Sequence, residues 1–137
     1  MKVLYDHQCF VQQQYGGVSR YHYQLIKELN KLQDVEVNLS LKYSNNFYIN
    51  EDKSFRVKKL FPKTKFYFKR TILDYLNRIY TRQKLELGEY DIFHPTYYNP
   101  YFLNYLNYIK SYFFQIIKST VIIIRISCWI ILVSWWN

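Results

Sequence analysis

The chain has 137 residues, a mass of 17.0 kDa and a formal net charge of +9, and half of its residues are hydrophobic. This length accommodates one domain and not two, and the hydrophobic content excludes an intrinsically disordered chain. Aromatic residues make up 21% of the sequence, so a packed core is affordable. No internal repeat is present.

The first forty residues have the pattern of a strand, a loop, a helix and a second strand. The apolar run at 2–5 predicts a buried strand, and the glycine pair that ends the segment 12–17 predicts a loop. A helical apolar stripe follows, with Gly17 or Ser19 as its cap, and the alternation over 35–41 predicts the second strand. The stripe consists of Tyr21, Leu25, Leu29 and Leu32. This order is that of a βαβ unit, which forms a right-handed parallel crossover.

Three more elements are expected after this unit. Residues 55–60 predict a short third strand, and an apolar stripe over 65–84 predicts a second long helix that Gly88 ends. Residues 90–94 predict a fourth strand, which Pro95 stops. The predicted fold class is therefore α/β, a partial Rossmann-like domain with a parallel sheet over residues 1–105.

The segment from Lys53 to Lys84 holds eleven basic residues and one acid, Asp74. Such a block indicates an anionic partner, namely phosphate, nucleic acid or an acidic lipid surface, or else a solvated helix face. The two cysteines, Cys9 and Cys128, have neither metal-ligand nor disulfide spacing, which favours a reducing cytosol. Residues 1–6 lack the pattern of a signal peptide, so a cytoplasmic location is expected.

Two stretches carry a resemblance to a known family. The first is MKVLYDHQ (1–8) with QYGGVSRY (14–21), and the second is YDIFHPTYYNPYFL (90–103). Both resemble the N-terminal domain of bacterial retaining glycosyltransferases of family 1 or family 4 type, which have the GT-B architecture of two Rossmann-like domains. The resemblance covers roughly residues 1–105 and implies sugar transfer from a nucleotide-diphosphate sugar to a glycan or lipid-linked acceptor.

The glycine loop is the first candidate site. Gly16 and Gly17 open a helix whose unpaired N–H groups and dipole favour a phosphate, and the alternative is a tight turn that touches no ligand. Arg20 could pair with that phosphate or face solvent. Asp6, at the end of the first strand, either takes part in the phosphate site by orienting the loop or is an ordinary strand-end carboxylate.

The second motif supplies the remaining candidates. The resemblance implies that His94 contacts the sugar or supports the transition state, while the alternative is a structural histidine. Tyr97 and Tyr98 could stack on a sugar or a lipid acceptor, or pack in the core. The family needs no metal, and a nucleotide-diphosphate sugar is a co-substrate rather than a cofactor.

Residues 106–137 depart from the family pattern and are rich in Ile and Trp. They are interpreted as a frameshift product, with a membrane anchor or a native core strand as alternatives. The family's C-terminal domain holds most of the donor site, so the chain is expected to be a truncated, inactive fragment. In the parent enzyme the basic block would dock on the inner face of the cell membrane. The alternative functions are a small tail-anchored membrane protein and, less favoured, a basic aromatic nucleic-acid binder.

Overall fold

The computed structural model describes residues 1–105, and the expectations for residues 106–137 lie outside this part of the chain. Residues 1–102 form one compact unit, built on a three-stranded parallel sheet with strand order β2-β1-β3. The strands are β1 (Lys2–Tyr5), β2 (Glu36–Leu39) and β3 (Ile92–His94). Val3 of the central strand pairs with Val37 on one side and Ile92 on the other. The prediction of a mixed α/β fold with a parallel sheet is confirmed.

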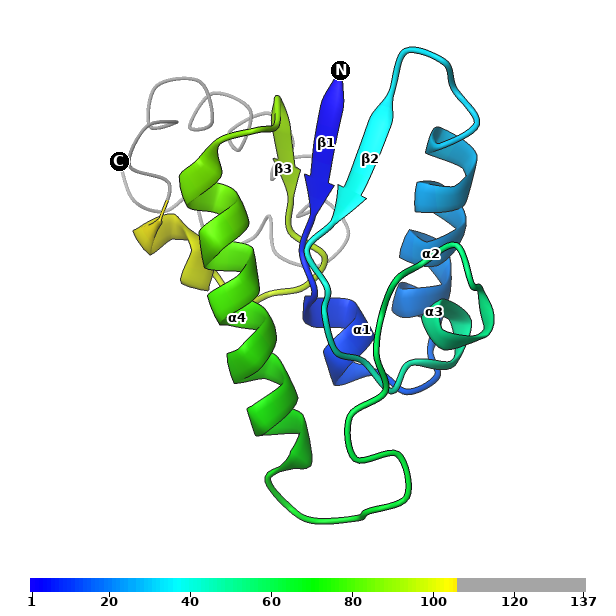
Figure 1. The fold of residues 1–137 in the computed structure, drawn as a ribbon, viewed down its shortest axis with the longest axis vertical. Coiled ribbons are helices and arrows are strands. Elements are labelled where there is room, and N and C mark those ends of the chain that lie inside the picture. Colours follow the sequence, from blue (N-terminus) through cyan, green and yellow to red (C-terminus); the bar gives the residue numbers. More distant parts are fainter. Residues whose placement is uncertain (106–137) are drawn as a thin grey trace, which may run out of the picture. The chain divides into compact units, whose positions relative to one another are not determined.

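Two long helices form the crossovers of this sheet. Helix α2 (Gly17–Leu29) connects β1 to β2, and α4 (Lys69–Leu87) lies between β2 and β3. The chain steps from the centre to one edge and then back to the other edge, so right-handed crossovers place the two helices on opposite faces. Figure 1 shows α2 and α4 on either side of the strands. The two crossovers run in opposite directions along the sheet, so the space between the carboxyl ends of β1 and β3 is the topological switch point.

Short helices occupy two segments for which no helix was predicted. Helix α1 (Gln8–Gln12) follows β1 directly, and α3 (Phe47–Glu51) follows β2 after a loop. A 3-10 helix, η1 (Tyr101–Asn104), follows β3.

The predicted strand at 55–60 is wrong. The segment makes one isolated parallel bridge, between Lys58 and Tyr43, and no ladder. Its apolar side chains do face inward: Phe55, Val57 and Leu60 pack against the core while the intervening residues are exposed. The apolar residues of this segment thus mark burial on one side of a loop rather than strand pairing.

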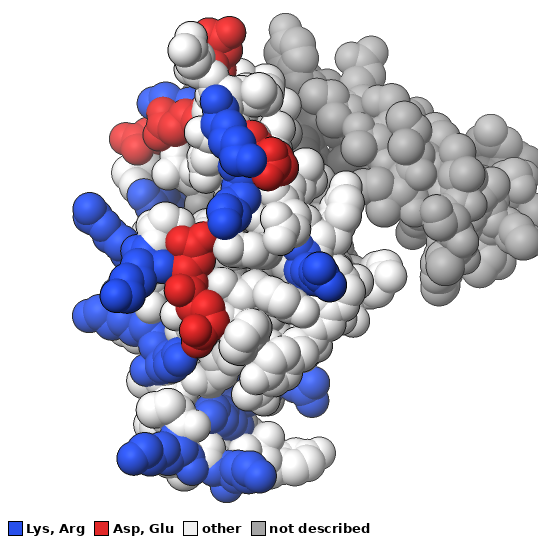
Figure 2. All heavy atoms as spheres, turned by 90° about the vertical axis from the view of Figure 1, so that its right-hand side faces the viewer, with Lys and Arg blue, Asp and Glu red and all other residues white. Residues whose placement is uncertain are grey.

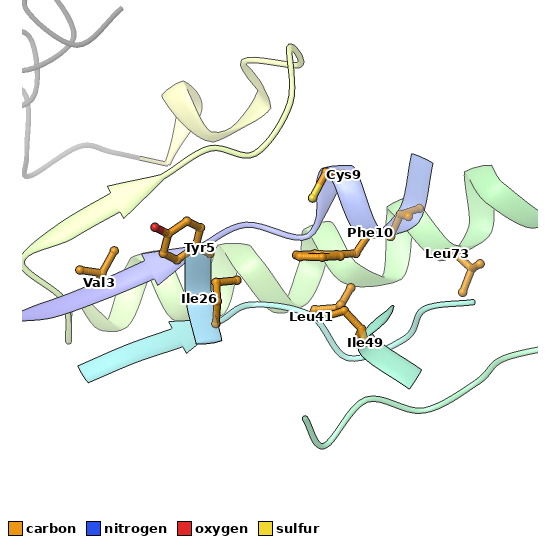
Figure 3. Close-up of a cluster of buried hydrophobic side chains, with 9 residues drawn as sticks. Val3, Tyr5, Cys9, Phe10, Ile26, Leu41, Ile49 and Leu73 are labelled. Carbon is orange, nitrogen blue, oxygen red and sulfur yellow. The ribbon is translucent and has the colours of Figure 1, made fainter. Parts of the chain in front are cut away.

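The core lies between the sheet and the helices. Val3 and Tyr5 of β1 meet Ile26 of α2, and Phe10 of α1 packs towards Ile49 of α3 (Figure 3). These five side chains are at most 5% exposed. Because β1 is buried on both faces, its sequence is a continuous apolar run rather than an alternating one.

A buried amide ties α4 to the loop that follows β2. Asn77 is fully buried, and its Oδ1 accepts the backbone N–H groups of Lys42 and Tyr43 at 2.8 and 3.0 Å. Its Nδ2 donates to the carbonyl oxygens of Tyr43 and Leu73 at 2.7 and 2.8 Å. All four hydrogen-bonding positions of the amide are used, so the side chain fixes the position of α4 at low desolvation cost.

Helix α4 ends at Gly88, as predicted. Gly88 has a φ of 66°, in the left-handed region, and its N–H donates to the carbonyl oxygen of Leu85. We expect Gly88→Ala to lower the free energy of unfolding by about 1 kcal/mol, because a Cβ disfavours this backbone conformation. Urea denaturation measures the change, and Gly88→Asn should cost less because asparagine tolerates left-handed angles. Equal stability of the alanine variant and the parent chain would contradict the assignment.

Among residues 1–105, no helix has the length and apolarity needed to cross a membrane.

Candidate functional site

The carboxyl ends of β1 and β3 are joined through a buried carboxylate. Asp6 is fully buried and accepts hydrogen bonds from the backbone N–H of Thr96 at 2.9 Å and from its hydroxyl. It also accepts the backbone N–H and the side-chain amide of Gln8, at 3.2 and 2.6 Å. The structure therefore gives Asp6 the role of holding two loops together, in a position that a phosphate cannot reach.

Three rings pack against one another where these strands meet α2. The His94 ring stacks on Tyr5, with centroids 4.7 Å apart, and the His22 ring meets His94 edge-on at 5.5 Å. Burial lowers the pKa of His94. Burial, together with the nearby His94, lowers the pKa of His22 to about 4. Both imidazoles are therefore neutral at pH 7.

The free nitrogen of His94 defines what this histidine could do. Its Nδ1 lies 3.1 Å from the carbonyl oxygen of Pro95, so the tautomer with hydrogen on Nδ1 donates there. Its Nε2 makes no hydrogen bond with the residues that the structure describes. A neutral, half-buried His94 can thus accept a hydrogen bond from a ligand hydroxyl.

The glycine pair lies at the start of α2, as predicted. Gly16 is the N-cap with an extended backbone, and the helix has no side-chain cap of its own. Instead, the side-chain oxygen of Gln13 accepts the N–H of Ser19 at 3.1 Å. The backbone N–H groups of Gly17 and Val18 have no acceptor among the described residues, and both residues are exposed. The predicted caps, Gly17 and Ser19, are thus the first and third residues of the helix.

The two glycines differ in how they tolerate a side chain. A Cβ at Gly16 would overlap the Gln13 carboxamide, whereas a Cβ at Gly17 would meet nothing within 4 Å. We expect Gly16→Ala to displace the Gln13 cap and to lower the free energy of unfolding by about 1 kcal/mol. Gly17→Ala, the matched control, should leave stability unchanged or slightly raised. Chemical denaturation of both variants checks the difference, and equal effects would argue against the cap.

The other predicted residues lie near this edge with different exposures. Arg20 is exposed on α2 and forms no ion pair within residues 1–105. Tyr97 packs against the core, while Tyr98 is 82% exposed, and their rings lie 4.8 Å apart. Tyr98 is thus available to a ligand, and Tyr97 has mainly a packing role.

A second polar cluster, which sequence reasoning did not identify, lies on the side of α4. The Nδ1 of the fully buried His7 lies 2.9 Å from the Thr81 hydroxyl. Its Nε2 lies 3.4 Å from Asp74, whose other carboxylate oxygen lies 2.7 Å from Nε of Arg78. The Arg78 guanidinium also lies over the Tyr101 ring, at 5.0 Å.

Two neighbouring side chains act on the pKa of Asp74. Burial acts to raise its pKa, but His7 and Arg78 together outweigh burial, so the pKa of Asp74 lies below its ordinary value. Asp74 and Arg78 have the i,i+4 spacing of a helical ion pair, whereas the contact with His7 joins segments that lie far apart in the sequence. In the described residues, no group of three potential ligands is placed to hold a metal ion.

The structure thus brings His94 and the first turns of α2 to one edge of the sheet, with Arg20 and Tyr98 exposed near it, and it buries Asp6. Comparisons with protein-family models, with curated proteins and with solved structures found no match to this chain.

Proposed function

We propose that the chain is part of the N-terminal domain of a retaining GT-B glycosyltransferase, which transfers a sugar from a nucleotide-diphosphate sugar to a glycan or lipid-linked acceptor. One observation carries the proposal: a glycine-initiated helix and His94 meet at the carboxyl edge of a parallel sheet with order β2-β1-β3. Open α/β sheets bind ligands where the strand order reverses, and here that point lies at β1 and β3.

Each residue at this edge has a role in the proposed function. The free N–H groups of Gly17 and Val18 receive a phosphate or an acceptor oxygen at the positive end of α2. Arg20 pairs with phosphate through its guanidinium fork. His94 accepts a sugar hydroxyl at Nε2, and the exposed ring of Tyr98 stacks on a sugar face.

A location at the membrane surface is part of the proposal. Basic side chains gather at the lower end of the molecule in Figure 2, where the loop before α4 lies, and acidic side chains lie higher up. A cationic surface with exposed aromatics, such as Tyr67 and Phe68, supports peripheral contact with anionic lipids. In this arrangement the carboxyl edge of β1 and β3 would bind its ligands close to the inner face of a cell membrane.

The test is a binding panel measured by ligand-observed NMR on the whole chain. The panel contains nucleotide-diphosphate sugars, oligosaccharides, diphosphate-linked lipid sugars and a single-stranded RNA. We expect a sugar-bearing ligand to bind, and Arg20→Ala to weaken it about tenfold by removing a charge-assisted hydrogen bond. Arg56→Ala removes an exposed arginine outside α2 and serves as the matched control. Binding of RNA alone, or equal loss in both variants, would overturn the proposal.

A further inference from the structure

A groove of about 630 Å³ has a lining that differs from the residues of the edge described above. One wall is the end of α1 with the two residues that follow it, 13 and 14, and a second is the pair Asn45–Asn46 after β2. The remaining wall is the segment 64–67 with the first turns of α4, from which Lys69, Arg70 and Leu73 line the groove. Gln13, which caps the start of α2, lies on its border, but Gly16, Gly17, Arg20 and His94 do not line the groove, so its lining differs from that of the proposed glycosyltransferase site.

The charge of the groove has one sign. Lys65, Lys69 and Arg70 line it, and no Asp or Glu is among the described lining residues. None of these three cations forms an ion pair within residues 1–105. The side-chain amides of Gln12 and Gln14, which have no hydrogen-bond partner in that range, add neutral donors to the same walls. A concave site with three uncompensated cations attracts an anion.

The basic wall is held in place by the chain itself. The Lys69 ammonium donates to the carbonyl oxygens of Phe61 and Thr64, at 2.5 and 3.2 Å. Phe61 turns the backbone with a φ of 54°, in the left-handed region, and its ring packs edge-on against Phe66 at 5.4 Å. Because these contacts already order the segment, a ligand would meet a preformed wall.

We infer that this groove binds a small molecule that carries a phosphate group. Phosphate oxygens are acceptors, and the groove offers them an ammonium, a guanidinium and carboxamide donors without a competing carboxylate. The rings of Phe66 and Tyr67 on the same wall provide an apolar surface for the rest of the ligand. The phosphate belongs either to a soluble diphosphate or to a lipid headgroup, and the two sources share this chemistry.

The experiment measures binding of two probes to the whole chain. Binding of inorganic diphosphate is measured by titration calorimetry. Binding to vesicles is measured by co-sedimentation, with phosphatidylcholine vesicles that contain about 20% phosphatidic acid and so have an anionic surface. The test variant is Lys65→Gln with Arg70→Gln, which removes two lining charges. The control is Lys59→Gln with Lys63→Gln, which removes two charges from the same basic block outside the groove. Circular dichroism verifies that both variants keep the parent fold.

We expect the lining variant to bind at least one probe about tenfold more weakly than the parent chain, and the control variant to change that affinity less than about twofold. Selective loss of diphosphate binding identifies a soluble ligand, and selective loss of vesicle binding alone identifies a lipid headgroup. Equal losses in the two variants would show diffuse surface attraction and overturn the inference. Absence of binding to both probes at low ionic strength would overturn it as well.

Discussion

Asp6→Ala is expected to lower the free energy of unfolding by about 3–5 kcal/mol, since it leaves several buried donors without an acceptor. The carboxylate of Asp6 is fully buried and accepts four hydrogen bonds, from Gln8 and from Thr96, which lies 90 positions away in the sequence. A loss of this size approaches the whole stability of a small domain. Asp6→Asn should be less stable than the parent chain but more stable than Asp6→Ala. Its amide oxygen still accepts a hydrogen bond, but its NH₂ group faces the NH₂ group of Gln8, and both are donors.

The matched control for Asp6 is Asp91→Ala. Asp91 also accepts a backbone N–H, from Lys2 at 2.6 Å, but it is exposed. Its removal should cost about 1 kcal/mol or less, because water replaces the lost acceptor. Urea denaturation followed by circular dichroism compares the variants. Equal losses at Asp6 and Asp91 would show that the link between β1 and β3 is not a main support of the fold.

The second large effect is a loss of stability in mild acid through His22. The pKa of His22 is about 4 in the folded chain, lowered by burial and by the nearby His94, against an ordinary value of about 6.5. As the pH falls below 6.5, the unfolded chain takes up this proton first, so the folded state loses stability down to about pH 4. A difference of this size corresponds to roughly 3 kcal/mol.

The groups around His22 fix the direction of this effect. The rings of Tyr5, Tyr21 and His94 pack against it, and the lowered pKa of His94 acts in the same direction. Asp6 opposes the shift but is the smallest of its causes. The Asp6 carboxylate therefore offsets only a small part of the cost of charging His22.

His22→Phe tests this prediction because it keeps a ring and removes the titration. We expect the free energy of unfolding to fall less steeply between pH 6.5 and 4 in this variant than in the parent chain. Tyr21→Phe alters a ring neighbour of His22 but leaves the imidazole, so its pH dependence should match that of the parent. An unchanged slope in His22→Phe would show that other groups control the acid transition.

The sequence predicted the elements that have a long or regular pattern. The strand β1, the helix α2 and the glycine that ends α4 each follow from local rules, and the structure has all three. The predicted apolar stripe of α2 is only partly right, because Tyr21 and Leu32 are exposed and the buried side chains of the helix are those of Ser19, His22 and Ile26. Helices α1 and α3 have five residues each, too few to show a helical period. The error at 55–60 has a different cause, because apolar residues show which side of a segment is buried and not whether a partner strand is present.

The site was less predictable because it depends on contacts between distant segments. The sequence placed Asp6 and His94 at strand ends, but it did not show that Thr96 would occupy the Asp6 carboxylate. Likewise, the basic block was visible as a charge run, while the groove that two of its lysines share with Gln12 appears only after folding. Local patterns locate an edge of the sheet, whereas burial at that edge is set by the tertiary fold.

Amide chemical-shift mapping tests most directly whether sugar and phosphate bind at the carboxyl edge of β1 and β3, next to the start of α2. The isotope-labelled chain is titrated with the sugar-bearing ligand that binds best. We expect shifts at Gly17, Val18, Arg20 and His94, with little change in the basic groove around Arg70. Shifts confined to that groove, or spread along the basic surface without Gly17 and His94, would contradict this expectation.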